Sequence, residues 1–370
     1  MLDYIGKHTS CRVMIDEIEA AALQQVYNFL NCPAFEGSKI RIMPDMHAGA
    51  GAVIGFTSTL TDKIIPNVIG VDIGCGVLAC CIEGFGEIDF AGFDHYLREN
   101  IPSGFTVNER IHPKIEESQD AAEYRRVARE TEQEEHYVMR SLKSLGGGNH
   151  FIELGRDQHG SVWMTIHSGS RNFGLKIANY HQAKAVKTVG RGHGLEWLEG
   201  DAAEHYLDHM HVAQRYAQYN RRLMADQLLR FFGWKFDECR TVESVHNYIN
   251  FKDRILRKGA ISAHVGEEVI IPWNMRDGLI IGIGKGNDDW NCSAPHGAGR
   301  IMGRGVAKRT LNVEEFRETM SGIWSSCVST NTLDESPMAY KDHSVIQDAI
   351  GDTIDIQLVV KPLYNFKASD

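Results

Sequence analysis

Five short segments place residues capable of metal or phosphate chemistry beside glycines. They are PDMHAGAG (residues 44–51), GVDIGCGV (70–77), GGGNHFIE (146–153), HSGSRN (167–172) and SAPHGAGR (293–300). Carboxylate, thiolate and imidazole groups are metal ligands. Arginine side chains and the N–H groups of glycine loops bind phosphate. Because functional residues concentrate on loops between regular elements, the set predicts metal-assisted chemistry on a phosphate.

Asp72, Cys75, His150, His167 and His246 form the candidate metal-ligand set. In GVDIGCGV a hard carboxylate and a soft thiol lie three residues apart, and the flanking glycines let the backbone turn sharply. A thiolate can bridge two metal ions. Taken alone, the cysteine is more typical of a buried free thiol. A single histidine is likewise more often a structural residue than a metal ligand. The prediction therefore depends on the whole set, which is compatible with Zn, Mn or Co.

Phosphate binding and nucleophilic attack are predicted from the remaining segments. The glycines at 146–148 lead into a predicted strand, and their N–H groups suit an anion. His150 and Glu153 differ by three positions, so on a strand they face opposite sides and do separate jobs. Arg171 has the guanidinium fork that binds two phosphate oxygens. His296 stands before a glycine-rich turn and a predicted helix, whose N-terminus would bind phosphate, and is placed to attack phosphorus.

The elements that must position these side chains form a mixed pattern. Hydrophobic periodicity and helix-favouring composition predict helices over residues 14–30, 115–145 and 201–232. Runs rich in β-branched residues predict strands over 39–43, 68–82 (strands joined by tight turns), 151–154, 162–166, 242–249, 268–271, 279–283 and 353–360. Because helices and strands do not alternate as βαβ units, we expect an α+β fold: a single large domain over 1–370, built on extensive mixed or antiparallel sheet with surrounding helices.

Composition narrows the class of protein. A 43% hydrophobic and 24% charged chain of 370 residues is typical of a folded enzyme. A net charge of −10 argues against non-specific coating of nucleic acid, but allows a local basic groove. Without an apolar run of roughly 20 residues or a signal-like N-terminus, we expect a cytoplasmic protein with no membrane contact. Eight scattered cysteines without a C-x-x-C pair predict free thiols rather than disulfides or a zinc ribbon.

The motifs as a set resemble those of the RtcB RNA ligases. DMHAGAGAVIG, GVDIGCGV, LGGGNHFIE, HSGSRNFG, VHN, RKGA, HGAGR, DESPMAYKD and PLYNFK occur in the family's order between residues 45 and 367. HGAGR, GGGNHF and HSGSR together are highly specific. The resemblance implies the RtcB fold and a GTP- and Mn²⁺-dependent ligase. Such an enzyme joins RNA 2′,3′-cyclic phosphate or 3′-phosphate ends to 5′-hydroxyl ends through a histidine–GMP intermediate, in RNA repair or tRNA splicing.

The resemblance also implies roles for individual residues. One of two Mn²⁺ ions would be held by Asp72, Cys75 and His150, and the other by Cys75, His167 and His246. His296 would be the nucleophile that carries GMP. Asp45 would orient it or act as a leaving-group acid, and Arg171 would bind a phosphate of the RNA end or of the nucleotide.

A nucleotide pocket follows from the same resemblance. Asn149 would contact the phosphates, and Glu153, Tyr340 and Lys367 the guanine. The implied nucleotide-binding residues are Asn149, His150, Glu153, His246, Asn247, Pro272, Asn274, Met275, His296, Gly297, Ala298, Gly299, Tyr340 and Lys367. The chain departs from the family at Trp273-Asn274-Met275, where Gly-Ser-Met is frequent, and at Leu279, where a serine is expected. These departures leave the nucleotide preference open.

Two alternative functions remain beside the ligase. One is a guanylyltransferase that caps 3′-phosphate ends without efficient sealing. The sequence feature relevant to this alternative is the departure from the family in the nucleotide-binding segment. The other is a non-catalytic RNA-repair scaffold, which the intact ligand set and His296 disfavour. A third alternative, a generic metallophosphoesterase, is disfavoured because this chain has no matching Asp/His spacing. The predicted partner is RNA with the ends named above, and the oligomeric state and the particular RNA are left open.

Overall fold

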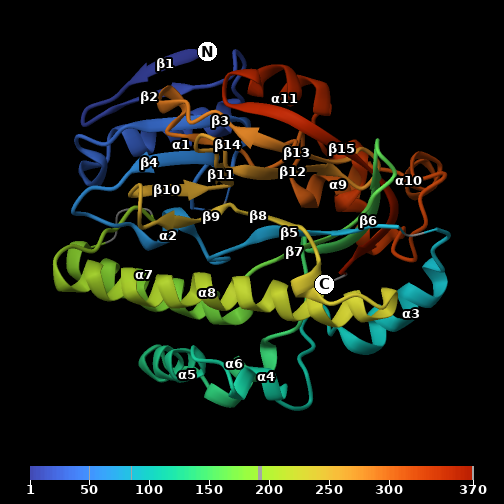
Figure 1. Ribbon diagram of the computed structural model, residues 1–370. Helices are drawn as coiled ribbons and strands as arrows, with labels where there is room; N and C mark the ends of the chain where they lie inside the picture. The colour runs from blue at the N-terminus through green and yellow to red at the C-terminus, as the bar shows by residue number, and fades with distance from the viewer. Residues whose placement is uncertain (50, 85, 191–193, 369–370) are drawn as a thin grey trace.

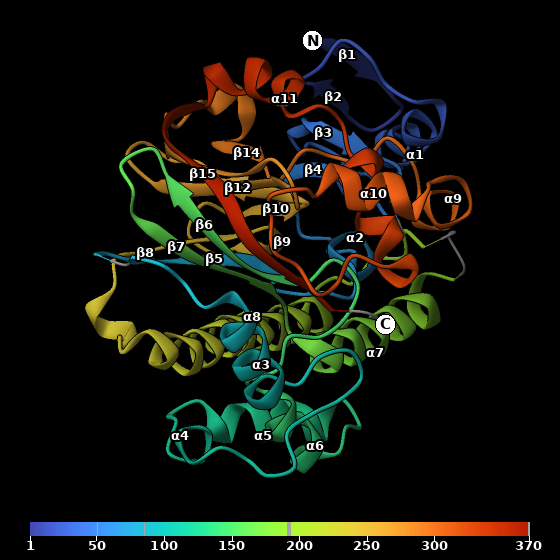
Figure 2. The same cartoon turned by 90° about the vertical axis from the view of Figure 1, so that its right-hand side faces the viewer.

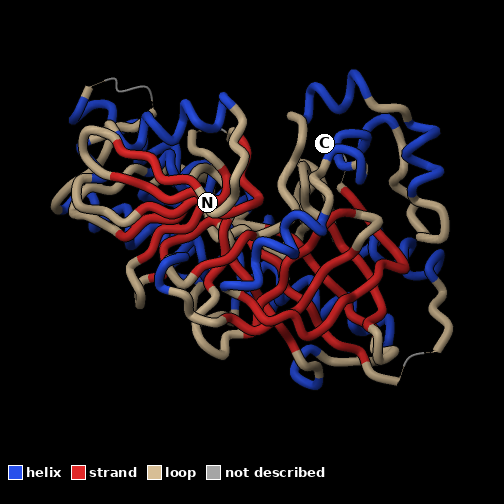
Figure 3. Tube along the Cα trace, turned by 90° about the horizontal axis from the view of Figure 1, so that it is seen from above, coloured by secondary structure: helices blue, strands red, loops and turns tan. Residues whose placement is uncertain are grey.

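Two large β-sheets form the body of the protein, and two long helices run along one side of them (Figure 1). The computed structural model describes residues 1–49, 51–84, 86–190 and 194–368. Seen from above, the strands gather in the middle of the molecule with helices mostly at its edges (Figure 3).

The first sheet has six strands and is built mainly from the N-terminal part of the chain. In spatial order they are β1 (Leu2–Ile5), β2 (Ser10–Val13), β3 (Ile40–His47), β4 (Ile54–Thr59), β10 (Ile255–Lys258) and β9 (Asn247–Asn250). Only the β2–β3 pair is parallel. The strand predicted over 39–43 is present as β3, and it continues through Asp45 to His47.

The second sheet has seven strands and is antiparallel throughout. In spatial order they are β12 (Glu268–Asn274), β13 (Gly278–Gly284), β15 (Ile354–Lys367), β6 (Phe151–Asp157), β7 (Val162–Ser168), β5 (Gly76–Ile82) and β8 (Thr241–Val245). Two further short strands, β11 (Ala260–Ser262) and β14 (Ser293–Pro295), pair with each other. Extensive antiparallel sheet with helices around it confirms the predicted α+β class.

Burial on both faces explains the apolar run of β5. Successive side chains of a strand point to opposite faces, and those of β5 enter two different hydrophobic clusters. Leu78 packs with the cluster that also holds Phe93 and Leu228, while Val77 packs with the one that holds Trp163. An all-apolar strand is therefore required between β7 and β8, and this strand leads out of the GVDIGCG turn.

Helices surround the sheets, and the two longest lie together on one side of them. The α-helices are α1 (Ala20–Leu30), α2 (Pro66–Ile69), α3 (Phe90–Asn100), α4 (Pro113–Glu116), α5 (Ala121–Glu130), α6 (Glu135–Ser141), α7 (Arg171–Val189), α8 (Asp201–Leu229), α9 (Arg304–Thr310), α10 (Val313–Thr319) and α11 (His343–Ala349). The long helices α7 and α8 lie against the sheets, and α4, α5 and α6 lie below them (Figures 1 and 2). No described helix is long and apolar enough to cross a membrane.

Helix α8 connects the helices on this side to the loops that carry the metal-ligand motifs. The guanidinium Nη1 of the fully buried Arg221 donates to the carbonyl oxygens of Gly74 and Ser168, each at 2.7 Å, and Nε donates to Glu243. One helical side chain thus holds the turn before Cys75 and the end of the strand that carries His167.

Several sequence-based boundaries are corrected by tertiary contacts. The helix expected from residue 14 begins at Ala20, because Met14 extends the sheet and its N–H donates to the Ile42 carbonyl. Residues 68–82 contain the end of α2 and strand β5 rather than several strands. The charged segment 115–145 forms three short helices rather than one. The strand expected over 242–249 is divided at His246 into β8 and β9.

Candidate active site

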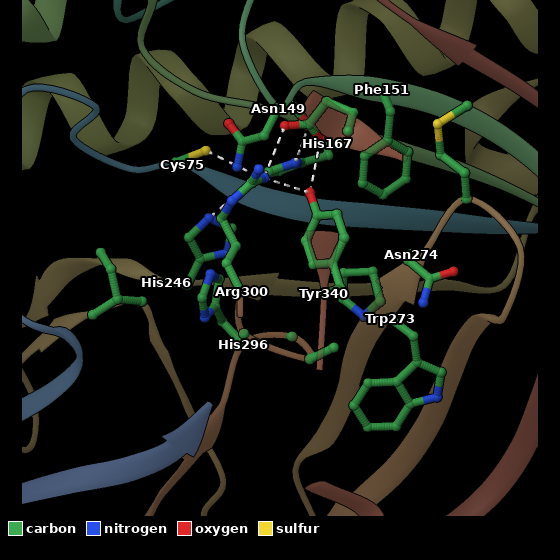
Figure 4. Close-up of a pocket in the computed structure, with 18 of the residues that line it drawn as sticks. Cys75, Asn149, Phe151, His167, His246, Trp273, Asn274, His296, Arg300 and Tyr340 are labelled. Atoms are coloured by element: carbon green, nitrogen blue, oxygen red, sulfur yellow. Dashed lines mark hydrogen bonds and ion pairs between the residues drawn. The ribbon is translucent and has the colours of Figure 1, made fainter. Parts of the chain in front are cut away.

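A cavity of about 300 Å³ lies between the two large sheets and is lined by residues of both (Figure 4). The predicted site residues that line it are Asp72, Cys75, Asn149, Glu153, His167, His246, Asn247, Pro272, Asn274, Met275, His296, Gly297, Ala298, Gly299, Tyr340 and Lys367. Cys75, His246 and His296 lie at one side of it, and Phe151 and Tyr340 at the other. The cavity therefore has a ligand-rich side and an aromatic side.

Five predicted metal ligands meet around the sulfur of Cys75. Its Sγ lies 3.2 Å from Nε2 of His167 and 3.5 Å from Nε2 of His150. The same His167 nitrogen lies 3.3 Å from Nε2 of His246, and His150 Nε2 lies 3.1 Å from Oδ2 of Asp72. The atoms fall into two groups, Asp72–Cys75–His150 and Cys75–His167–His246, each within 4.8 Å. Cys75 belongs to both groups.

Local backbone geometry brings these side chains together. Gly70 and Gly74 have φ of 83° and 72°, and they form the turn that presents Asp72 and Cys75. A side chain at Gly169 would meet Asp72 Oδ1 at 2.0 Å, so glycine is required there. Strand register places His167 near His150, because His167 on β7 pairs with Phe151 on β6, the residue that follows His150.

Two of the histidine ligands have the protonation state that a divalent cation needs. Burial, followed by the neighbouring imidazoles, lowers the pKa values of His167 and His246 well below the usual range, so both rings are neutral and offer lone pairs. Burial and then Asp72 raise the pKa of Cys75. A bound cation would instead stabilise the thiolate. Buried Lys258 lines the cavity beside this set. The donor set therefore fits two metal ions that share a thiolate.

His296 is held by a fully buried carboxylate. Asp45 Oδ2 lies 2.6 Å from Nδ1 of His296 and accepts from its backbone N–H at 3.1 Å. The Nε2 atom of His296 takes no part in this contact. The centroids of the His296 and His246 rings are 4.8 Å apart. Gly299, with φ of 74°, lets the HGAGR loop approach Asp45, because a Cβ there would lie 2.3 Å from the Asp45 carbonyl.

The predicted helix after His296 is wrong. His296 follows strand β14, and the next helix, α9, begins only at Arg304. Gly299 of HGAGR is used for close approach to Asp45 on β3 rather than for helix entry.

The aromatic side of the cavity contains a buried network of charged and polar side chains. Glu335 accepts from Tyr340 Oη at 2.8 Å and from Lys367 Nζ at 3.0 Å. Burial by itself raises the pKa of Glu335, but Lys367, Arg304 and Arg300 outweigh it and lower that pKa to about 2. Glu335 is therefore ionised.

A second carboxylate on this side behaves differently. Glu153 accepts from Asn365 Nδ2 at 2.8 Å, and burial raises its pKa to about 8. Lys367 Nζ lies 4.6 Å from the centroid of the Phe151 ring. Residues that sequence reasoning did not single out are Phe151, Lys258, Arg300, Glu335 and Asn365. The sequence feature that could have identified them is that each belongs to one of the motifs GGGNHFIE, RKGA, HGAGR, DESPMAYKD and PLYNFK.

Three predicted or altered positions lie differently from the expectation. Arg171 does not line the cavity; it donates to Ser144 Oγ at 3.0 Å and to the Gly104 carbonyl at 2.8 Å. These contacts support the loop before Gly146, and the predicted phosphate contact of Arg171 stays a prediction. Asn274 lines the cavity, but its amide binds Asp277 and the backbone of its own turn. Leu279 is fully buried in a hydrophobic cluster and does not line the cavity.

Comparisons with known proteins agree with the fold and the site. The family model described as tRNA-splicing ligase RtcB matches residues 25–368. The chain is 29% identical over 382 residues to RNA-splicing ligase RtcB of Escherichia coli K12, with 92% of each chain covered. It is 30% identical to RNA-splicing ligase RtcB1 of a second Escherichia coli strain, again with 92% of each covered. It is 25% identical to tRNA-splicing ligase RtcB of Aeropyrum pernix, with 81% of this chain and 82% of the relative covered.

These matches define the class of protein: it is an RNA ligase, and its His, Cys and Asp clusters are compatible with a metal-dependent one. More particularly, because the family model spans nearly the whole chain, the protein belongs to the RtcB family.

Proposed function

We propose that this protein joins RNA 3′-phosphate or 2′,3′-cyclic phosphate ends to 5′-hydroxyl ends, consuming GTP and using two Mn²⁺ ions, in cytoplasmic RNA repair or tRNA splicing. Residues 1–370 would act as one catalytic domain. The observation that carries the proposal is the contact of His296 Nδ1 with the buried Asp45 at 2.6 Å, beside two ligand groups that share Cys75. A nucleophile and a binding site for polyanionic substrates are thereby adjacent.

The metal ions would be held by the residues that meet around Cys75. Asp72, Cys75 and His150 would hold one, and Cys75, His167 and His246 the other. When bound, the ions supply positive charge that neutralises and orients phosphate groups. Lys258 adds a further positive charge at the same side of the cavity.

His296 would form the covalent intermediate. Asp45 keeps the proton on Nδ1, so Nε2 carries the lone pair that attacks the α-phosphorus of GTP. A P–N bond forms, the bond to pyrophosphate breaks, and pyrophosphate leaves with the electron pair. The imidazole gains positive charge in this step, and the Asp45 carboxylate stabilises it.

Transfer to RNA completes the proposed reaction. Water first opens a cyclic phosphate to a 3′-phosphate. An oxygen of that phosphate then attacks the phosphorus of histidine–GMP, which breaks the P–N bond and restores neutral His296. The 5′-hydroxyl attacks the activated 3′-phosphorus and loses its proton to solvent, while GMP leaves and the phosphodiester forms. Guanylylation is needed because a free 3′-phosphate has no good leaving group.

Guanine recognition is assigned to the aromatic side of the cavity. Glu153 would accept from guanine N1–H and the exocyclic amine, a donor pair that adenine lacks. Tyr340 and Lys367 would contact the base, with Glu335 holding both in place. Asn149 would contact the phosphates, and its position beside the metal-ligand set supports that role.

The direct test is a gel assay with the purified protein, GTP, Mn²⁺ and RNA fragments bearing 3′-phosphate and 5′-hydroxyl ends. Joined product supports the ligase. Accumulation of a guanylylated 3′ end without joined product would favour the capping guanylyltransferase instead. Neither product would favour the scaffold.

GTP binding is expected to strengthen with pH through the pKa of Glu153. Its pKa of about 8 leaves the carboxyl protonated at neutral pH, whereas contact with guanine N1–H requires the carboxylate. Below pH 8, GTP affinity should therefore rise by up to about tenfold per pH unit. Isothermal titration at several pH values measures this slope. The Glu153→Gln variant, which cannot titrate, should lose the slope; an equal slope in both proteins would contradict the role of Glu153.

Lys367→Ala is expected to weaken guanylylation more than sealing. Removal of a charged hydrogen bond to the buried Glu335 should lower guanylylation by about 10- to 100-fold. Sealing of a pre-guanylylated RNA should change little, because the nucleotide is already attached. Exposed Lys361 on the same strand offers the matched control Lys361→Ala. Equal losses in both steps would argue against a guanine-pocket role.

A further inference from the structure

Three histidines meet outside the cavity, where helices α5, α7 and α8 pack together. His181 lies on α7, and His205 and His209 lie on α8. His205 and His209 are four residues apart, so they occupy one face of their helix. Glu130, the last residue of α5, faces them. We propose that this cluster is a separate site for one divalent transition metal of the zinc class, which ties α5 to α7 and α8.

The distances within the cluster are close to those of a metal site. His181 Nε2 lies 3.0 Å from His209 Nδ1, and Glu130 Oε2 lies 2.7 Å from His209 Nε2 and 3.0 Å from His205 Nε2. One nitrogen from each histidine lies within 4.8 Å of the others. Nitrogens around a tetrahedral zinc ion are about 3.4 Å apart. Small rotations of the three rings would therefore close them on an ion.

Hydrogen bonding alone leaves the cluster incompletely satisfied. His181 and His209 are fully buried, and Nδ1 of His181 has no hydrogen-bond partner among the described residues. A buried ring nitrogen without a partner is costly and rare. The other ring nitrogen, Nε2, faces Nδ1 of His209 inside the cluster and can direct its lone pair at a cation.

Charge and accessibility also suit a cation. Burial, followed by the two neighbouring histidines, lowers the pKa of His181 to about 3, and burial lowers that of His209. Both rings are therefore neutral ligands. The hydrogen bond from His205 is the first of several contacts that lower the pKa of Glu130 to about 2, so Glu130 is ionised and adds a negative charge beside the three rings. The side chains of His205 and Glu130 are 38% and 36% exposed, which leaves a route for an ion from solvent.

The three imidazoles supply the ligands, and Glu130 accepts hydrogen bonds from two of them, as a carboxylate commonly does from metal-ligating histidines. Imidazole ligands favour Zn, Ni or Cu, and the three histidines and Glu130 include no thiolate, unlike the set around Cys75. Figure 2 shows α5 beside α7 and α8, on the side away from the sheets. Because Arg221 of α8 holds the Gly74 and Ser168 carbonyls, an ion here would also brace the helix behind the active site.

Co²⁺ distinguishes the two sites by spectroscopy. A thiolate ligand produces a near-ultraviolet charge-transfer band, which reports the Cys75 set, whereas a histidine site without a thiolate produces only visible d–d bands. We would titrate the metal-free full-length protein with Co²⁺, count bound ions by elemental analysis and record both spectral regions. The wild type and the variants His205→Gln and His211→Gln would be compared. His211 is exposed on the same helix and outside the cluster, which makes it the matched control.

The expected result is that His205→Gln binds one Co²⁺ fewer per chain than the wild type while its charge-transfer band is retained. His211→Gln should match the wild type in both respects. Adding the ion should also raise the unfolding temperature of the wild type more than that of His205→Gln. Equal numbers of bound ions in the wild type and His205→Gln would overturn the proposal. If His205→Gln also lost the charge-transfer band, a wild-type crystal grown with Co²⁺ would be measured by anomalous scattering. A peak among the three histidines would uphold the site. No peak there would refute it.

Discussion

Replacing His296 with alanine is expected to abolish the transfer of label from α-labelled GTP to the protein in the presence of Mn²⁺. The imidazole is the only group that would form the P–N bond in the proposed reaction, and Asp45 leaves its Nε2 free to do so. In another enzyme, loss of the covalent nucleophile costs on the order of 10⁶-fold in rate. The label should therefore fall below detection, and joined RNA with it.

The chemistry of the label identifies the attached atom. A phosphoramidate on histidine is labile in acid and stable in alkali, so wild-type label should be released only by acid. His211→Ala changes an exposed histidine outside the cavity and should label like the wild type. Sealing should be restored to His296→Ala by a pre-guanylylated RNA, since that substrate enters after the covalent step. Label of wild-type intensity in His296→Ala would contradict the assignment of the nucleophile.

Cys75→Ala is expected to release both active-site metal ions and to abolish ligation. The Cys75 sulfur belongs to both ligand groups, so one substitution removes a ligand from each. Loss of an outer-shell partner alone costs about 10- to 100-fold in metal affinity, and a larger loss is expected for a shared thiolate. Elemental analysis of the purified variant and the gel assay for joined RNA measure the two effects.

Cys239→Ala is the matched control for this substitution. Cys239 is a half-buried thiol that does not line the cavity, so its loss should change neither metal content nor ligation. Excess Mn²⁺ should partly rescue Cys75→Ala if its defect lies in affinity. Wild-type turnover in Cys75→Ala would show that the two ions are not held through this sulfur.

The local elements were largely predictable from the sequence because their signals are local. The strand segments 151–154 and 162–166 and the helix over 201–232 are present within a few residues of their expected ends. Periodicity failed where a tertiary contact competed with it. Residues 14–19 have a helical pattern, yet Met14 joins the sheet through the Ile42 carbonyl. The glycines after His296 suggested a turn into a helix, whereas Gly299 provides close approach to Asp45.

The candidate site was predictable in its members but not in its contacts. Motif order named the residues that line the cavity, and the structure then brings Asp45 and His296 together across 251 positions of the chain. Arg171 shows the opposite case, since a residue type suited to phosphate instead binds Ser144 and Gly104. The cluster of His181, His205 and His209 carries no sequence motif and becomes visible only when α7 and α8 pack.

The sequence by itself determined the class of fold, the family and the set of side chains available for chemistry. These follow from residue types, their periodicity and short glycine-rich motifs, which are properties of neighbouring residues. The ligand groups that share Cys75 and the carboxylate beside His296 were implied by the family resemblance, and only the tertiary structure decided their distances and which charged groups surround Lys367. The physical reason is that these contacts join residues far apart in the chain, and their distances depend on strand register and on how the sheets and helices pack.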